Sequence, residues 1–247
     1  MVSLSLRRPL GRIALVAALV VLAIGTVAWA GGFFDRDPFH FLKAEGRRSD
    51  IAALYFSGDM GLRFGMGPKT TAALARHGVP VLGVSSSTLF AVHHDRAYVD
   101  KVVADAARRA LAETGARKLV LIGQSYGADI LQTGAAALPA DLRPKVAAII
   151  LVVPGRTVFF RADPSGIAYR GTPDSLGPAT AAALTWAPLT CIYGTAETDS
   201  LCPLVKLPNA TVVAMPGGHF LAHDEAALIG HVLASLRHFL PSREHGA

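Results

Sequence analysis

The stretch GQSYG at residues 123–127 decides the fold of this 247-residue chain. It follows the apolar run KLVLI at 118–122 and opens a helical stretch at 128–138. Glycines at both ends leave room for a sharp strand-to-helix turn that lifts the Ser125 hydroxyl off the end of the strand. In such a turn we expect Ser125 to act as a nucleophile, with the N–H of Tyr126 pointing at the oxyanion that its attack would create. An ordinary turn with Ser125 as a helix cap is the alternative.

Short apolar runs alternate with longer helical stretches from residue 50 onward. Strands are expected at 51–56, 79–84, 118–122, 146–153, 190–193 and 211–215. Helices are expected at 68–77, 98–114, 125–138, 178–186 and 226–239. Nearly continuous apolar runs suit strands buried on both faces, and alternation with helices favours a parallel sheet. We therefore expect an α/β-hydrolase-like domain at 50–240, with a mostly parallel sheet flanked by helices.

The charge balance argues against a nucleic-acid partner. The formal net charge is +6, but Arg7, Arg8 and Arg12 lie in the first 30 residues, which contain no acid. The rest of the chain has 21 basic and 18 acidic residues, and no large basic field is expected from it. The sequence H-H-D at 93–95 lacks a third metal ligand at suitable spacing, so no metal or cofactor is expected. Asp95 is instead expected to cap the helix that follows.

The N-terminus has the composition of an export segment. A basic start at 7–12, an uncharged apolar run at 13–30 and the sequence AWA at 28–30 are the parts of a secretory signal. The run is also long enough to span a bilayer, so residues 1–30 are either a cleaved signal peptide or a signal anchor. Both readings export the rest of the chain to an oxidising compartment. Residues 31–49 show no clear periodicity of hydrophobic residues and are expected to be a linker.

A serine nucleophile needs a base, and in this fold the triad follows the order serine, acid, histidine. His219 comes after the last expected strand through the turn PGG at 216–218, where a loop can carry an imidazole over the sheet edge. His223 is the second candidate. Other histidines after Ser125 fall on the expected terminal helix or in the tail at 241–247.

The acid should follow the strand at 190–193. Asp199 is the first choice, because the loop must travel a few residues to reach the histidine, and Glu197 is the alternative. Cys191 and Cys202 bracket both carboxylates, and in an oxidising compartment they can form a disulfide that holds the acid in register with the base. Two buried free thiols are the other possibility.

The loop SGDMG at 57–61 is expected to supply the second oxyanion donor, from the backbone of Asp59 or Met60. Asp59, Gln124 and Ser86 are expected to contact substrate. Asp59 would also suit a cationic group, as would Asp129 in the helix after the elbow. The long segment at 154–178 is expected to act as a lid over the site.

Four motifs together resemble the bacterial virulence protein family VirJ/AcvB. They are SGDxG at 57–61, GxSYGAD at 123–129, CIYGxxExDSxCP at 191–203 and PGGHF at 216–220. The resemblance implies a periplasmic α/β-hydrolase fold, hydrolysis of lysyl-phosphatidylglycerol at a membrane surface, and an association with type IV secretion and its proteins. It also implies Ser125, Asp199 and His219 as the triad.

The chain departs from the family pattern around the expected pocket. Met60 and Leu62 replace a glycine and a tryptophan, Gln124 replaces a tyrosine, Ser86 an aspartate, and Phe220 a second histidine. We expect these changes to affect which substrate the pocket accepts more than they affect the catalytic residues.

Three functions follow from these residues. The first is a serine hydrolase of carboxylic esters, such as an aminoacylated phospholipid. The second is a non-catalytic periplasmic binding or secretion-associated protein on a hydrolase fold. The third is a generic exported esterase or lipase for small or acyl-chain esters, in which apolar residues at 158–160 cover an acyl pocket.

Overall fold

The computed structural model describes residues 7–240, so the start of the export segment and the expected tail at 241–247 lie outside the described residues. A seven-stranded sheet forms the centre, in the order β1-β3-β2-β4-β5-β8-β9. All neighbours pair in parallel except β1 with β3. The strands are β1 (Phe39–Leu42), β2 (Ile51–Phe56), β3 (Val81–Val84), β4 (Lys118–Gln124), β5 (Val146–Val152), β8 (Leu189–Gly194) and β9 (Ala210–Met215).

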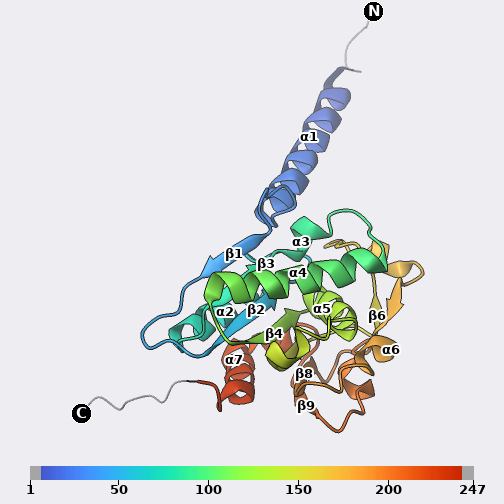
Figure 1. Cartoon of the computed structure of the whole chain (residues 1–247). Coiled ribbons are helices and arrows are strands. Elements are labelled where there is room, and N and C mark those ends of the chain that lie inside the picture. Colours follow the sequence, from blue (N-terminus) through green and yellow to red (C-terminus); the bar gives the residue numbers. More distant parts are fainter. Residues whose placement is uncertain (1–6, 241–247) are drawn as a thin grey trace, which may run out of the picture.

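Helices cover both faces of this sheet (Figure 1). The helices are α1 (Arg7–Ala30), α2 (Gly67–Arg76), α3 (Ser86–Leu89), α4 (Arg96–Thr114), α5 (Tyr126–Ala136), α6 (Gly177–Ala181) and α7 (Glu225–Leu236). Four short 3-10 turns are η1 (Arg143–Lys145), η2 (Ala168–Arg170), η3 (Cys202–Leu204) and η4 (Leu221–His223). The expected α/β-hydrolase-like architecture is confirmed.

The alternation of side chains along β2 explains the two layers. Ala52, Leu54 and Phe56 pack with α4 and α5, whereas Ile51, Ala53 and Tyr55 pack with α2 and α7. Successive strand residues point to opposite faces, so a strand that is apolar throughout must be covered on both sides.

The termini of α4 follow from local chemistry. Asp95 caps the helix as expected, because its carboxylate accepts a hydrogen bond from the Tyr98 N–H at 2.8 Å. Gly115 ends the helix with φ 62°, in the left-handed region that glycine adopts without strain. The expected helix at 178–186 is shorter than predicted, since α6 ends at Ala181.

Two connecting segments contain short strands that the sequence does not predict. Residues 31–49 are not a plain linker, because β1 within them pairs antiparallel with β3, with Phe39 opposite Val84. A strand of four residues on a sheet edge has too short a pattern to recognise in the sequence. The long segment at 154–178 contains a small hairpin of β6 (Thr157–Val158) and β7 (Ser175–Leu176).

The predicted apolar helix at the N-terminus is confirmed. Within the described residues, α1 is the one helix long and apolar enough to cross a membrane, because its segment Gly11–Ala30 contains an 18-residue stretch with a mean hydropathy of 2.6. A signal sequence has the same properties. Figure 1 shows α1 projecting away from the body of the protein.

Candidate active site

Ser125 stands on a strained turn between β4 and α5. Its φ is 53° and its ψ is −128°, a conformation that costs free energy and recurs at functional sites. A Cβ on Gly123 would lie 2.6 Å from the Ala128 Cα, and a Cβ on Gly127 would lie 2.2 Å from the Ser57 oxygen. Both glycines are therefore required by close packing of the backbone, as the elbow motif predicts.

The elbow brings the hydroxyl of Ser125 to the imidazole of His219. Ser125 Oγ lies 2.8 Å from His219 Nε2, and His219 Nδ1 lies 2.6 Å from Glu197 Oε1. These distances suit the tautomer in which Nδ1–H donates to Glu197 and Nε2 accepts from the serine hydroxyl. The Glu197 side chain is largely buried, at 14% exposure, so its charge acts in a medium that screens it weakly.

The carboxylate that contacts His219 belongs to Glu197, the alternative acid, and not to Asp199, the first choice. The chain turns directly after β8, where the N–H of Glu197 donates to the Gly194 oxygen at 2.9 Å, and this turn aims Glu197 at the next loop. Asp199 has by then left the turn. Its carboxylate pairs with Arg156 at 3.4 Å, accepts a 3.3 Å hydrogen bond from Thr157, and is more than half exposed.

The loops that carry Glu197 and His219 are locked together. A Cβ on Gly194 would lie 2.1 Å from the Gly218 oxygen, and the Ala196 N–H donates to the Gly217 oxygen at 2.8 Å. The expected disulfide between Cys191 and Cys202 is confirmed and closes the loop that holds Glu197. His223, the spare candidate for the base, stacks on the ring of Phe220.

The expected oxyanion loop lies beside the nucleophile. A Cβ on Gly58 would lie 3.6 Å from the Ser125 Cβ, and Asp59 and Met60 line the same cavity as Ser125. Tyr126 is the first residue of α5, so its N–H has no acceptor within the helix. The assignment of oxyanion donors to Tyr126 and to the Asp59–Met60 backbone remains a prediction.

Ser86 does not contact the cavity, which corrects its expected role. It is fully buried, its hydroxyl donates to the Ser57 oxygen at 2.7 Å, and its N–H donates to Ser57 Oγ at 3.0 Å. Ser86 therefore braces the start of the oxyanion loop. Gln124 does line the cavity, and its side-chain oxygen accepts a hydrogen bond from Tyr55 Oη.

A cavity of about 640 Å³ opens above Ser125. Four of its lining residues are acidic, and among the described residues its lining contains no Lys or Arg. The acids are Asp59, Asp129, Glu197 and Asp199. Apolar side chains, Phe64, Met66, Phe159 and Phe220, complete the wall. Of the apolar residues at 158–160, Val158 and Phe160 are buried in the core and Phe159 alone reaches this cavity.

Two of these carboxylates, Asp129 and Asp59, have no Lys or Arg beside them in the described lining of the cavity. Burial raises the pKa of Asp129 well above its usual value, opposed by a 2.7 Å hydrogen bond from the Gly155 N–H and reinforced by the charges of Asp199, Glu197 and Asp59. Burial also raises the pKa of Asp59, opposed by a 3.1 Å hydrogen bond from the Tyr169 hydroxyl and by the charge of the His219 imidazolium.

Tyr169 is a site residue that the sequence did not predict. It lies in the long segment at 154–178, and its ring stacks on that of Tyr126 with centroids 6.2 Å apart. The Tyr126 hydroxyl is buried beside it without a hydrogen-bond partner among the described residues. No local pattern in the sequence distinguishes Tyr169 from other loop residues.

Comparison with known proteins gives a family and a fold. Residues 50–240 match the family described as "VirJ: Bacterial virulence protein (VirJ)". A search of curated proteins found no matching sequence.

Solved structures with the same fold share little sequence with this chain. Dienelactone hydrolase from Anabaena variabilis is 14% identical, with a TM-score of 0.57, covering 82% of this chain and 92% of its own. XC6422 from Xanthomonas campestris, described as an a/b serine hydrolase without lid, is 19% identical, with a TM-score of 0.55 and coverage of 83% and 89%. The esterase domain of a Rhodothermus marinus protein is 17% identical, with a TM-score of 0.54 and coverage of 81% and 92%.

Proposed function

Because the chain belongs to the VirJ family of bacterial virulence proteins, we propose that it is an exported serine hydrolase of carboxylic esters. The observation that carries this proposal is the unbroken chain of contacts from Ser125 through His219 to Glu197, at 2.8 and 2.6 Å. A serine on a strained elbow, a base within hydrogen-bond reach and a buried carboxylate that orients the base are the parts of a nucleophilic triad.

The reaction follows from these positions. Ser125 Oγ attacks the ester carbonyl carbon while His219 Nε2 takes the hydroxyl proton. Glu197 stabilises the imidazolium that forms, and the N–H groups of Tyr126 and of the loop at 58–61 bind the oxyanion. The C–O bond to the leaving alcohol then breaks, and His219 returns the proton to the alcohol oxygen. Water, activated by the same histidine, releases the acyl group from Ser125.

The acidic cavity supports an ester with a cationic acyl group, and we propose an aminoacylated phospholipid such as lysyl-phosphatidylglycerol. Burial of the Asp59 and Asp129 carboxylates is unfavourable, and no Lys or Arg in the described lining of the cavity offsets it. An ammonium group in the cavity would offset that cost, and it would also lower both raised pKa values. The acyl product is then the free amino acid, and phosphatidylglycerol is the leaving alcohol.

Purified full-length protein in detergent tests this proposal directly. We expect it to release lysine from lysyl-phosphatidylglycerol, and Ser125→Ala to release none. A short neutral nitrophenyl ester serves as the parallel substrate. If the wild type hydrolysed that ester but released no lysine, the proposed triad would be supported and the aminoacyl lipid would be excluded as its substrate.

A generic esterase is the second candidate, because Phe64 and Phe159 give the cavity an apolar wall that suits an acyl chain. Activity on neutral esters of increasing chain length, with none on the cationic lipid, would select it. A non-catalytic role beside a secretion system predicts no covalent labelling of Ser125. A fluorophosphonate probe that labels the wild type and spares Ser125→Ala excludes that role.

A further inference from the structure

Helix α1 joins the body at the edge of the sheet that carries the candidate active site. Strand β1 runs antiparallel to β3 and begins opposite Val84, the last residue of β3. The Ser85 N–H also donates to the Pro38 oxygen at 2.7 Å. The segment between α1 and β1 therefore lies at the carboxyl edge of the parallel strands, where β4 ends at the elbow of Ser125.

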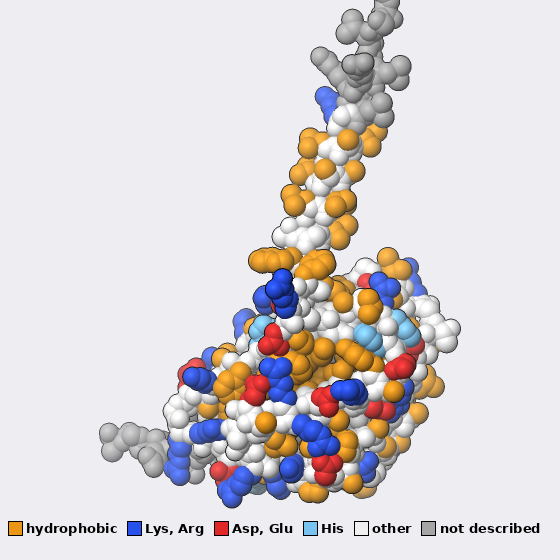
Figure 2. Space-filling model, turned by 45° about the horizontal axis from the view of Figure 1, so that its top comes forward, with side chains coloured by type: hydrophobic (Ala, Val, Ile, Leu, Met, Phe, Trp, Pro, Cys, Tyr) orange, Lys and Arg blue, Asp and Glu red, His pale blue; other side chains and the backbone are white. Residues whose placement is uncertain are grey.

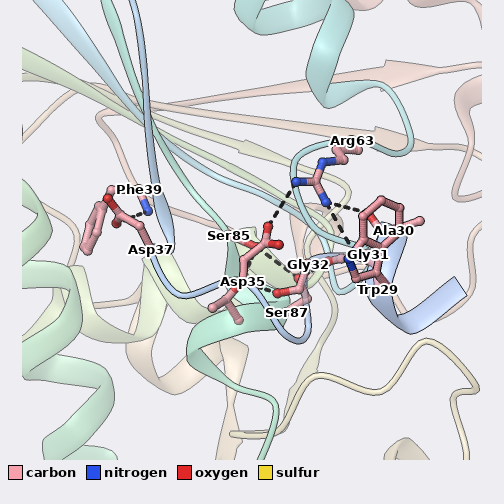
Figure 3. Close-up of polar contacts among 11 residues, drawn as sticks. Trp29, Ala30, Gly31, Gly32, Asp35, Asp37, Phe39, Arg63, Ser85 and Ser87 are labelled. Atoms are coloured by element: carbon pink, nitrogen blue, oxygen red, sulfur yellow. Dashed lines mark hydrogen bonds and ion pairs between the residues drawn. The ribbon is translucent and has the colours of Figure 1, made fainter. Parts of the chain in front are cut away.

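The junction between α1 and the body is docked rather than free. Gly31 and Gly32 are buried, and their carbonyl oxygens accept hydrogen bonds from the hydroxyls of Ser87 and Thr88. Arg63 donates to the Ala30 oxygen at 3.2 Å and pairs with Asp35 at 3.3 Å. Figure 3 shows Arg63 reaching across the end of α1 toward Trp29 and Ala30 on one side and Asp35 on the other.

One loop touches both the junction and the cavity. Gly61 has φ 74°, and a Cβ there would lie 2.3 Å from the Gly31 oxygen, so the two backbones are in direct contact. Gly61 lines the cavity together with its neighbour Met60, and Phe64 lines it three residues further along. The expected oxyanion loop therefore separates the foot of α1 from the cavity by the thickness of one backbone.

The surface of α1 suits a bilayer. The segment Gly11–Ala30 is 20 residues long, contains an 18-residue stretch of mean hydropathy 2.6, and has no residue of that stretch buried. In the sequence, Arg7, Arg8 and Arg12 precede or begin this segment and no acid does, which favours a cytoplasmic N-terminus.

Trp29 and Phe34 mark the other end of the span. Both are about two-thirds exposed, and they lie at the end of the apolar segment, where aromatic side chains commonly anchor a membrane span in the interface. Figure 2 shows hydrophobic side chains along the described part of α1 and again on the face of the body beside its foot.

We propose that α1 is retained as a transmembrane anchor, and that its docked foot turns the mouth of the cavity toward the outer leaflet of the same membrane. No free linker separates the span from the body, so the body cannot turn away from the bilayer without breaking the contacts of Gly31, Gly32 and Arg63. Phe64 and Phe220, which line the cavity and are exposed, then face lipid. A lipid ester reaches Ser125 from the leaflet without leaving it.

The first test asks whether residues 1–30 remain. We expect the intact mass of the protein purified from membranes to include them, and the protein to resist extraction with alkaline carbonate. Ala28→Leu, which replaces a small residue that the signal peptidase requires, serves as the uncleaved reference. A wild type that begins at Gly31 while Ala28→Leu keeps the segment would overturn the anchor.

The second test measures orientation with a single tryptophan. The chain has two tryptophans, so Trp29→Phe with Trp186→Phe gives a silent background. Phe220→Trp reports on the mouth of the cavity, and Phe34→Trp reports on the foot of α1. Arg117→Trp is the matched control, because this exposed residue precedes β4 at the opposite edge of the sheet.

Full-length protein is reconstituted in phosphatidylglycerol vesicles that carry bromine on the acyl chains. We expect bromine to quench Phe220→Trp and Phe34→Trp and to leave Arg117→Trp unchanged. If bromine quenched the Phe220→Trp and Arg117→Trp variants to the same extent, the proposed orientation of the cavity toward the membrane would be overturned. Quenching needs no turnover and should persist with Ser125→Ala, so an oriented protein that fails to hydrolyse the lipid refutes the proposed substrate alone.

Discussion

The Glu197 carboxylate accepts a 2.6 Å hydrogen bond from the His219 imidazole, although the two residues lie on loops that follow different strands. The contact is possible because β8 and β9 are parallel neighbours, with Gly194 opposite Met215. Loops that leave the same edge of adjacent strands emerge side by side, and here glycines on both loops allow their backbones to touch.

The first prediction separates the two acids. We expect Glu197→Gln to reduce kcat on a neutral nitrophenyl ester by about 10³–10⁴-fold, the scale seen when an amide replaces the acid of a serine triad and the wrong histidine tautomer results. Asp199→Asn should cause a far smaller loss, because its carboxylate faces Arg156. A larger loss in Asp199→Asn than in Glu197→Gln would return the role to Asp199.

The second prediction concerns the disulfide. Replacing Cys191 and Cys202 together by alanine should lower the free energy of unfolding by about 2–3 kcal/mol and should also reduce kcat, because the bridged loop positions Glu197. Thermal unfolding with and without reductant measures the effect. The double variant should not respond to reductant, and a wild type equally indifferent would show that the bridge adds no stability.

The third prediction gives Asp129 a pH signature. Its pKa is raised in the folded protein, so between the unfolded pKa and the folded one the native state holds a proton that the unfolded chain has lost. The contribution of Asp129 to the free energy of unfolding is therefore largest below the unfolded pKa. It decreases as the pH rises from the unfolded pKa through the folded pKa.

Asp129→Asn removes this titration while keeping an oxygen that can accept from the Gly155 N–H. The free energy of unfolding of the variant, measured by denaturant from acid to neutral pH, should exceed that of the wild type by an amount that grows with pH. If the cavity binds a cation, the same variant should raise KM for the cationic ester and leave KM for a neutral ester nearly unchanged. A difference in stability that does not depend on pH would contradict the prediction.

The fourth prediction uses two glycines of opposite environment. Gly127→Ala should destabilise the protein by about 2–3 kcal/mol or more and abolish activity, because the new Cβ meets the Ser57 oxygen at 2.2 Å. Gly230→Ala, on an exposed part of α7 with open space around it, should instead stabilise the protein by about 0.5–1 kcal/mol. Chemical denaturation of both variants measures the contrast, and similar values for the two would refute the packing argument.

Local pattern was enough to predict most of the sheet. The strands β2, β4, β5, β8 and β9 match the predicted ranges within one or two residues. For β2, β4 and β5 the reason is that a strand covered on both faces must be apolar almost throughout. The elbow at Ser125 is also predictable from local sequence. A side chain on either flanking glycine would collide with nearby backbone, so the sharp turn requires glycine on both sides of the serine.

The sequence by itself predicted the layered fold, placed Ser125 on a strand-to-helix elbow, and singled out His219 and a possible Cys191–Cys202 disulfide, because each depends on hydrophobic periodicity, turn chemistry or chain order. Only the tertiary structure decided between Glu197 and Asp199, moved Ser86 from the pocket to the support of a loop, and brought Tyr169 to Asp59. It also joined β1 and the end of α1 to the sheet edge beside Ser125. These outcomes depend on which way a side chain points after a turn and on contacts between distant segments, and neither is encoded in the local period of the chain.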